Sequence, residues 1–398
     1  MRNKLNLSYA IAQGTYWMYF CVIISFSSVY LIAKGYSNTE IGWILALLNV
    51  ISVIMQPIFA DMADRSEKLT LVQITVIFSA ILVALTVSLF TMKEKSLILT
   101  TSFVTIGALL MSLQPLINAI AFNYSSFEIP INYGVARSGG SIFYSALSVV
   151  MGSLIVTFGI ITVPVIGTVV LLLFIGSLIT TEAMYNNYNH TDVKEAGRAR
   201  AARPDQPVSF ISFAKKNKML FIFSIGTLMV YFQNAVLNNY LFQIIVPIGG
   251  TEALMGRLFS FMAILELPAL FFFSNLRKKF SYETMLKIAS IGYIFKVFLT
   301  YLAKTAGFVY IAFLFQMISF PLYLASSVHL VDEVLERSDA IKGQSLITGM
   351  MTLSAVFASL LGGIVLDVQG PSSLLLFSTL LCVVGTIVVF VSVGKIKA

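Results

Sequence analysis

Twelve long apolar runs constrain this chain more than any other feature. Six lie at about residues 8–33, 39–60, 70–92, 97–122, 132–158 and 160–182, and six more lie at about 218–246, 252–275, 283–303, 306–330, 343–366 and 372–394. A helix needs roughly 20 apolar residues to cross a bilayer, and lipid excludes open strands because their backbone groups would lack hydrogen-bond partners. We therefore predict an all-α membrane protein with twelve transmembrane helices.

Composition agrees with this prediction and excludes several classes of protein. Of the 398 residues, 58% are hydrophobic and only 11% are charged, whereas a soluble domain carries about 25% charged residues. The two cysteines and two histidines form neither a disulfide framework nor a metal-ligand pattern. Because a phosphate loop and a Ser-His-Asp grouping are also lacking, we expect no enzymatic activity, no cofactor and no metal.

Basic residues predict how the helices are oriented. With the N-terminus inside, 20 of the 26 Lys and Arg fall in segments on the cytoplasmic side, five fall on the opposite side, and Lys296 lies within a run. This asymmetry follows the positive-inside rule, so the net charge of +8 requires no nucleic-acid partner. The first run lacks a cleavage site. We expect a multi-pass protein of the inner (cytoplasmic) membrane with both termini in the cytoplasm.

Weak internal similarity divides the chain into halves. Matching short segments lie 206, 211 and 209 residues apart, around Pro115 and Pro321, Pro57 and Pro268, and Ser145 and Ser354. Parallel repeats of six helices are typical of a large class of carriers. We predict an N-terminal six-helix bundle at 1–184, a cytoplasmic linker at 185–214 and a C-terminal six-helix bundle at 215–398.

Two charged residues lie deep within predicted helices of the second half. Glu266 is eleven residues before Arg277, roughly 16 Å into the membrane, and Lys296 is nine residues past Lys287, roughly 14 Å deep. Such charges are costly in lipid and usually mark a cavity or a partner. We expect Glu266 and Lys296 to face one cavity and to pair; the alternative is an ion pair that only fixes helix packing.

Further polar residues are candidates for binding a solute. Arg137 lies near the start of the fifth run and Asn118 near the end of the fourth; the alternatives are a snorkelling arginine and a simple helix–helix hydrogen bond. Aromatic rings with amide and charged donors suit hydroxyl-rich solutes, because rings cover apolar faces while the donors bind hydroxyls. The other candidates of these types are Gln13, Trp17, Asn238 and Gln316.

A short charged segment follows the second run. Asp61, Asp64 and Arg65 lie where we predict the loop between the second and third helices. Two acids beside a base are compatible with a solvated turn or with a gating loop.

These residues resemble the major facilitator superfamily, and within it the lactose permease-like (oligosaccharide–proton symporter) group. Gln56-Pro57-Ile-Phe-Ala60 followed by Asp64-Arg65 is similar to the superfamily signature between helices two and three, with Ala60 in place of the usual glycine. Gly134-Val-Ala-Arg137 resembles the motif with the sugar-binding arginine, and Glu266 falls where the group has a sugar-binding glutamate.

Other positions depart from the group. Lys296 stands where the group has an arginine, and Asn118 replaces the glutamate that partners the sugar-binding arginine. Gln316 replaces a histidine, and Ser319 replaces the glutamate linked to proton coupling. By this resemblance, the chain has part of the group's sugar site but lacks most of its coupling residues. This leaves Glu266 as the candidate for proton coupling.

Together these observations predict a secondary transporter that works by alternating access. The expected partners are a small-molecule substrate (a sugar, an oligosaccharide or a nucleoside-like solute), a proton and the lipid bilayer, and we expect a functional monomer. A drug or solute exporter and an uncoupled facilitator remain alternatives. A non-transporting membrane sensor is the alternative from another class.

Overall fold

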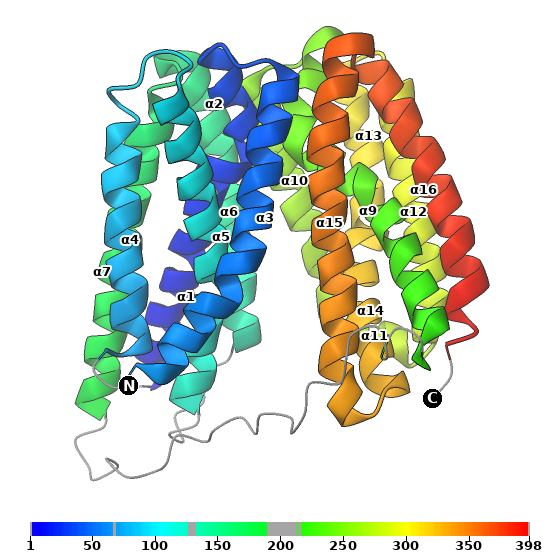
Figure 1. The fold of residues 1–398 in the computed structure, drawn as a ribbon, viewed down its shortest axis with the longest axis horizontal. Helices are drawn as coiled ribbons and strands as arrows, with labels where there is room; N and C mark the ends of the chain where they lie inside the picture. The colour runs from blue at the N-terminus through cyan, green and yellow to red at the C-terminus, as the bar shows by residue number, and fades with distance from the viewer. Residues whose placement is uncertain (1, 67–68, 126–132, 189–212, 214–215, 397–398) are drawn as a thin grey trace. The chain divides into compact units, whose positions relative to one another are not determined.

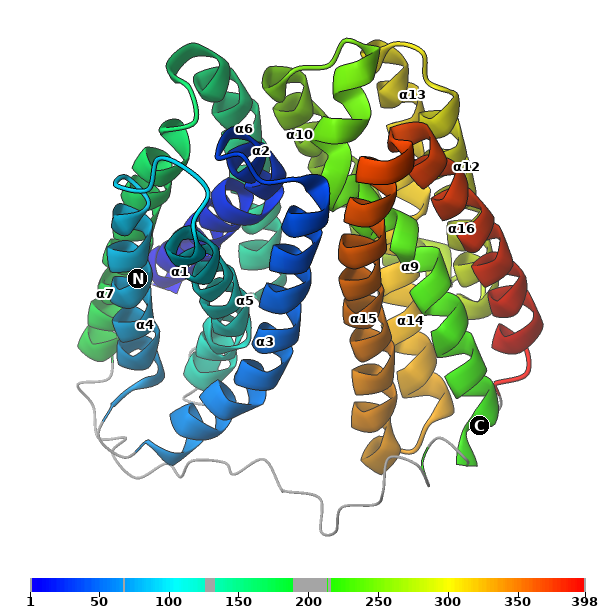
Figure 2. The ribbon, with the colours of Figure 1, turned by 45° about the horizontal axis from the view of Figure 1, so that its top comes forward.

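The computed structural model describes residues 2–66, 69–125, 133–188, 213 and 216–396, and these form helices joined by short turns and loops (Figures 1 and 2). Within these ranges twelve helical segments are long and apolar enough to cross a membrane. Many apolar side chains on them are exposed, among them Leu97, Phe271 and Val368. Exposed apolar surface of this extent suits contact with lipid rather than with water. The chain is therefore a multi-pass membrane protein.

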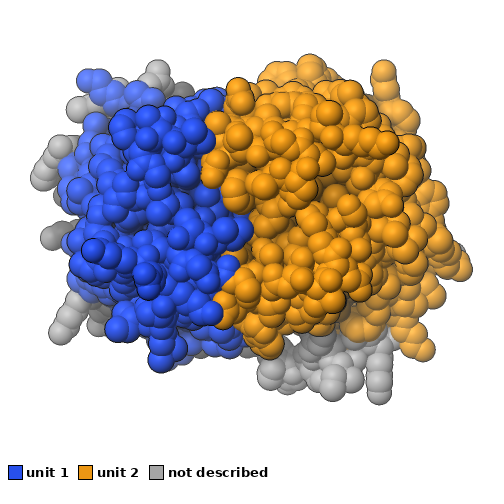
Figure 3. Space-filling view, turned by 90° about the horizontal axis from the view of Figure 1, so that it is seen from above, with its two compact units in different colours: residues 1–36, 47–201 blue, residues 37–46, 202–398 orange. Residues whose placement is uncertain are grey.

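Two compact units divide the chain (Figure 3). Unit 1 comprises residues 1–36 and 47–201, and unit 2 comprises residues 37–46 and 202–398. The predicted linker at 185–214 falls largely outside the described residues, although its first four residues continue the preceding helix.

Unit 1 begins with a first span that is not one regular helix. It consists of α1 (Arg2–Phe20), the π-helical segment η1 (Cys21–Ser25) and α2 (Ser27–Ala33). The other helices of the unit are α3 (Asn38–Arg65, from residue 47 on), α4 (Leu71–Ser88), α5 (Leu97–Ser125), α6 (Tyr133–Phe158) and α7 (Thr162–Tyr188). Helix α1 packs closely against α6 and α7.

Unit 2 contains more breaks in its helices. It consists of α9 (Lys218–Ile245), η2 (Val246–Ile248), α10 (Glu252–Phe271), α11 (Phe273–Arg277), α12 (Tyr282–Leu302), η3 (Ala306–Phe308), α13 (Val309–Phe313), η4 (Leu314–Ile318), α14 (Phe320–Val334), α15 (Arg337–Gln369) and α16 (Pro371–Val393). Helix α9 packs against both α15 and α16. The predicted tenth run, 306–330, is thus two α-helices joined by a 3₁₀ segment.

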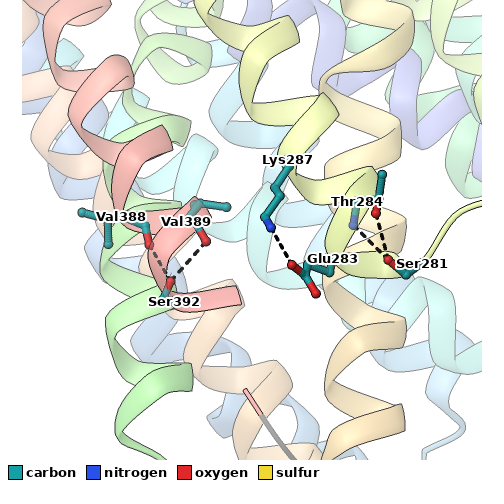
Figure 4. A network of polar contacts seen from close by, with 7 residues as sticks. All are labelled: Ser281, Glu283, Thr284, Lys287, Val388, Val389 and Ser392. Atoms are coloured by element: carbon teal, nitrogen blue, oxygen red, sulfur yellow. Dashed lines mark hydrogen bonds and ion pairs between the residues drawn. The ribbon is translucent and has the colours of Figure 1, made fainter. Parts of the chain in front are cut away.

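Local sequence sets several helix starts. The Thr70 side chain accepts a hydrogen bond from the backbone N–H of Gln73, and Gln73 reaches back to Thr70, which is a capping box for α4. The side chains of Thr251 and Ser281 cap α10 and α12, each by accepting from the backbone N–H of the third residue of its helix (Figure 4 for Ser281). Such caps satisfy N–H groups that have no partner within the helix.

The first residues of α3 are clamped within unit 2. The Asp367 carboxylate, near the end of α15, accepts from the backbone N–H groups of Asn38 (3.2 Å) and Thr39 (2.7 Å) and from the Asn38 amide (2.8 Å). A Cβ at Gly363 would lie 2.3 Å from the Asn38 carbonyl oxygen, so only glycine permits this approach. A carboxylate at a helix N-terminus also interacts favourably with the helix dipole.

Candidate functional site

In unit 1, Gln13 connects α1 to α5. Its amide nitrogen donates to the Tyr9 hydroxyl (2.7 Å) and to the Asn118 side-chain oxygen (3.1 Å), and its side chain is buried. The Tyr9 hydroxyl in turn donates to the Ile117 carbonyl (2.9 Å). Two of the predicted residues, Gln13 and Asn118, are therefore in direct contact.

One helical turn further along α1, Trp17 meets Arg137. The guanidinium carbon of Arg137, on α6, lies 4.1 Å from the centre of the Trp17 ring. Gly140 leaves the space for this ring, because a Cβ there would lie 2.6 Å from Trp17 Cδ1. A cation over the face of an indole is stabilised by about 0.5–2 kcal/mol, depending on burial.

These four residues form what we call the α1 cluster: Gln13, Trp17, Asn118 and Arg137. Gln13 and Trp17 are four residues apart, so they lie on the same face of α1. The cluster offers one flat apolar ring, one fixed cation and two amides. Tyr16 contacts the edge of Trp17, with ring centres 5.5 Å apart and planes at 85°.

The π-helical segment η1 begins four residues after Trp17. Ser25, its last residue, is hydrogen-bonded to the Tyr144 hydroxyl on α6 (2.8 Å). π-Helical turns are rare and occur frequently at functional sites. The apolar pattern of the first run gave no sign of this change in helical geometry.

In unit 2, Lys296 is completely buried on α12. Its ammonium group donates to the Gln316 side-chain oxygen (2.6 Å) and to the Asn234 side-chain oxygen (3.3 Å). The ring of Phe313 lies 5.4 Å from the same nitrogen. A buried cation needs such partners, because burial without them would be very costly.

Gln316 also contacts the carboxylate. Its amide nitrogen donates to Glu266 Oε1 on α10 (2.9 Å), while its oxygen accepts from Lys296. The geometry therefore differs from a simple pair of Glu266 and Lys296, because one amide bridges the two charges. Gln316 lies in the 3₁₀ segment η4, and Ser319 at its end has non-helical backbone angles (φ −98°, ψ −83°). We call Asn234, Glu266, Lys296 and Gln316 the Lys296 cluster.

The residue predicted from α9, Asn238, lies apart from the Lys296 cluster. Asn238 is exposed and does not join the Lys296 cluster in the described contacts, whereas Asn234, one turn earlier, does. Next to it, Gln233 is fully buried, and neither polar atom of its side chain has a partner among the described residues. The amide-rich sequence pointed to this helix but not to the face that meets Lys296.

The predicted gating loop is also placed differently. Asp61 and Arg65 lie in the last turns of α3, which runs to Arg65, and the loop begins only after it. Arg65 Nε is 2.8 Å from Asp61 Oδ1, and the two side chains are 69% and 47% exposed. Spacing of four residues on a helix explains this ion pair. The side chain of Asp64 lies outside the part that the structure describes.

The comparisons with known proteins place the chain among membrane transporters. The family model described as the MFS_1 like family matches residues 9–377. No curated protein matches the sequence.

Several solved structures share the fold. The nucleoside transporter NupG has a TM-score of 0.80 at 12% identity, over 99% of both chains. The POT family transporter PepTSo has a TM-score of 0.75 at 11% identity, over 98% of both chains. A bacterial homologue of the human lysosomal transporter Spinster, in an occupied form, has a TM-score of 0.70 at 12% identity, over 99% of this chain and 97% of that chain. With its family match over nearly its whole length, the chain belongs to the MFS_1-like family of transporters, within the major facilitator superfamily.

Proposed function

We propose that the protein is a proton-coupled carrier for a solute that contains a sugar, with a free sugar or oligosaccharide as the first candidate. The observation that carries this proposal is the α1 cluster. Arg137 over the Trp17 ring, with Gln13 and Asn118 nearby, combines an aromatic face with amide and guanidinium donors. Ring faces and converging donors are what a pyranose or furanose needs.

A nucleoside is the second candidate substrate. The structure of the nucleoside transporter NupG covers 99% of this chain, and a nucleoside also carries a ribose with hydroxyl groups. The α1 cluster and the Lys296 cluster together offer a ring face, amides and both signs of charge. We propose that the α1 cluster binds the solute, that the Lys296 cluster takes part in transport, and that transport proceeds by alternating access.

The experiment that tests the substrate class is uptake into proteoliposomes. A labelled panel of mono-, di- and trisaccharides, nucleosides and an amphipathic dye is offered with an inward proton gradient. Accumulation of one sugar or nucleoside by wild type, lost in Trp17→Ala, supports the proposal. Equilibration without accumulation indicates a facilitator. Export of the dye with no uptake of the panel would replace the proposal with the exporter alternative.

Glu266 is the carboxylate that we propose to couple transport to protons. Glu266→Gln keeps the shape and a hydrogen-bond acceptor for Gln316 but removes the exchangeable proton. We expect this variant to lose gradient-driven accumulation while still exchanging solute at equal concentrations on both sides. Glu252→Gln, at the start of α10, is the matched control. Accumulation at the wild-type level in Glu266→Gln would exclude this role.

We also propose that the protein works as a monomer in the cytoplasmic membrane, with both termini in the cytoplasm. The support for this orientation is the distribution of Lys and Arg.

A further inference from the structure

The four residues of the α1 cluster differ in how far a solute can reach them. Trp17, Asn118 and Arg137 are each partly exposed, whereas Gln13 is only 1% exposed. A partly exposed side chain can bind a solute directly, while a buried one holds its neighbours in place. The chemistry that the cluster offers is therefore that of the indole ring, the Asn118 amide and the Arg137 guanidinium.

The accessible polar groups of the cluster are mainly hydrogen-bond donors. Asn118 Oδ1 already accepts from Gln13 Nε2 (3.1 Å), so the NH₂ group is what Asn118 mainly has left to offer. Arg137 has five N–H donors and no acceptor, and the indole nitrogen of Trp17 also only donates. The other amide oxygen of the cluster, Gln13 Oε1, belongs to the buried residue.

The three helices that carry the cluster contribute no carboxylate. The sequences of α1, α5 and α6 contain neither Asp nor Glu. The Lys296 cluster differs in this respect, because it includes Glu266, and Gln316 bridges that carboxylate and the Lys296 ammonium. The α1 cluster thus combines one fixed positive charge with several donors, and its own helices bring no negative charge.

This balance of groups favours an acidic solute over a neutral one. Each hydroxyl of a neutral sugar has an O–H that needs an acceptor, and a donor left without a partner in a protein site costs free energy. An ionised carboxylate only accepts, and the planar fork of a guanidinium matches its two oxygens in a bidentate pair. A sugar that carries a carboxylate therefore fits these donors better than the same sugar without one.

A phosphate ester matches the charge of the cluster less well. It carries about −1.5 to −2 at pH 7, whereas a carboxylate carries a single charge, which the one guanidinium can balance. The Trp17 ring adds a flat apolar face, and such a face suits the apolar side of a pyranose. Charge and shape together indicate a carboxylate on a sugar ring.

We propose that the solute bound by the α1 cluster is an acidic sugar, a pyranose with a carboxylate, such as a hexuronate or an oligosaccharide that contains one. The carboxylate accepts from Arg137 and from the NH₂ group of Asn118, and the pyranose ring lies against Trp17. This assignment rests on the proposed function, since it specifies the charge of the sugar that the carrier binds.

The test is equilibrium binding to the purified full-length protein, followed by the fluorescence of Trp17 in a Trp43→Phe background. The probes are glucuronate, galacturonate and digalacturonate, each with its uronamide and its neutral parent sugar, together with glucose 6-phosphate and the ring-free acid gluconate. A uronamide has nearly the shape of the acid but no charge. We expect each acid to bind about tenfold more tightly than its uronamide and its parent sugar, because charge-assisted hydrogen bonds are roughly twice as strong as neutral ones.

Two variants test the side chains that bind the carboxylate. Arg137→Gln replaces the cation by a neutral amide and should remove the preference for the acids. Asn118→Asp keeps the shape and the acceptor for Gln13 but adds a carboxylate, so it should weaken binding of the acids and strengthen binding of the neutral sugars. Asn275→Asp, at an exposed position of α11, adds the same charge and is the matched control, which should keep the wild-type preference. If Arg137→Gln does not fold, Asn118→Asp carries the test alone.

The contrary outcomes separate this proposal from the proposed function. A neutral sugar that binds as tightly as its acid, or a preference for acids that survives in the Asn118→Asp variant, would overturn the acidic sugar and leave the sugar carrier in place. The absence of binding by every acid, or tighter binding of glucose 6-phosphate, would also overturn it. Gluconate bound as tightly as glucuronate would mean that the ring is not recognised, which would contradict the proposed function as well.

Discussion

At the scale of single residues, Gln316 is the amide that bridges the buried Lys296 ammonium and the half-buried Glu266 carboxylate. Gln316→Leu removes the acceptor of Lys296 and the donor of Glu266, and hydrogen bonds to charged groups contribute about 1.5–3 kcal/mol each. We expect this variant to lose about 3 kcal/mol of stability, measured by thermal unfolding in detergent. Gln344→Leu, which removes an exposed hydrogen bond to Asp332, should change stability much less.

Replacing Glu266, Lys296 and Gln316 together tests whether the two charges cause the loss of stability. Because buried ion pairs contribute little net stability, the triple variant Glu266→Gln/Lys296→Met/Gln316→Leu should be more stable than Gln316→Leu alone. A triple variant that is no more stable would mean that the lost stability does not come from the two charges that Gln316 bridges.

A second prediction at this scale concerns the ring face of Trp17. Gly140→Val places a side chain against Trp17 and should move the ring away from Arg137. If the contact between the Trp17 ring and the Arg137 guanidinium contributes about 1.4 kcal/mol to solute binding, its loss weakens binding by about tenfold. Gly139→Ala is the matched control, because its Cβ would lie an ordinary 3.9 Å from Ala10. Binding can be followed by the fluorescence of Trp17 in a Trp43→Phe background. Equal affinity in the two variants would contradict a binding role for this ring.

The sequence predicted which residues are candidates for the site better than it predicted which of them contact one another. Charged residues are rare enough in apolar runs that Glu266 and Lys296 were identifiable from their positions alone. Asn234 and Asn238 are one turn apart on α9, and choosing between them requires the rotation of that helix against α12. The exposed side chain of Asn238 shows that this rotation places it away from Lys296.

At the scale of helices, hydropathy predicted the spans but not their breaks. The tenth run is mostly apolar, yet it changes from α13 to the 3₁₀ segment η4 just where Gln316 bridges Lys296 and Glu266. Backbone geometry of this kind depends on tertiary hydrogen bonds, which leave no periodic signal in sequence. For the same reason, the sequence did not reveal that α3 continues as a helix to Arg65.

The clamp on α3 provides the prediction at this scale. Gly363→Ala should push Asn38 away from α15, because the new Cβ would lie 2.3 Å from the Asn38 carbonyl oxygen. Faster hydrogen exchange at the backbone amides of residues 38–42 would report the loss of the Asp367 contacts. Gly349→Ala on the same helix is the control, since no heavy atom lies within 4 Å of its added Cβ. Unchanged exchange in Gly363→Ala would show that the clamp does not protect these amides.

At the scale of the whole molecule, the distribution of basic residues predicts the orientation in the membrane. In intact cells, a membrane-impermeant maleimide should label Glu94→Cys, in the segment between α4 and α5, but not Lys279→Cys, between α11 and α12. The native thiols of Cys21 and Cys382 are buried and should give little background. The reverse labelling pattern would invert the proposed orientation of both termini.

The division of α3 has a mechanical consequence. Its residues up to Ala46 belong to unit 2, and its residues from Leu47 on belong to unit 1. A continuous α-helix of 28 residues is about 42 Å long and keeps its shape through its own backbone hydrogen bonds. Because Asp367 also holds its first residues, the chain passes from one unit into the other through a stiff, hydrogen-bonded helix rather than through a loop that could lengthen.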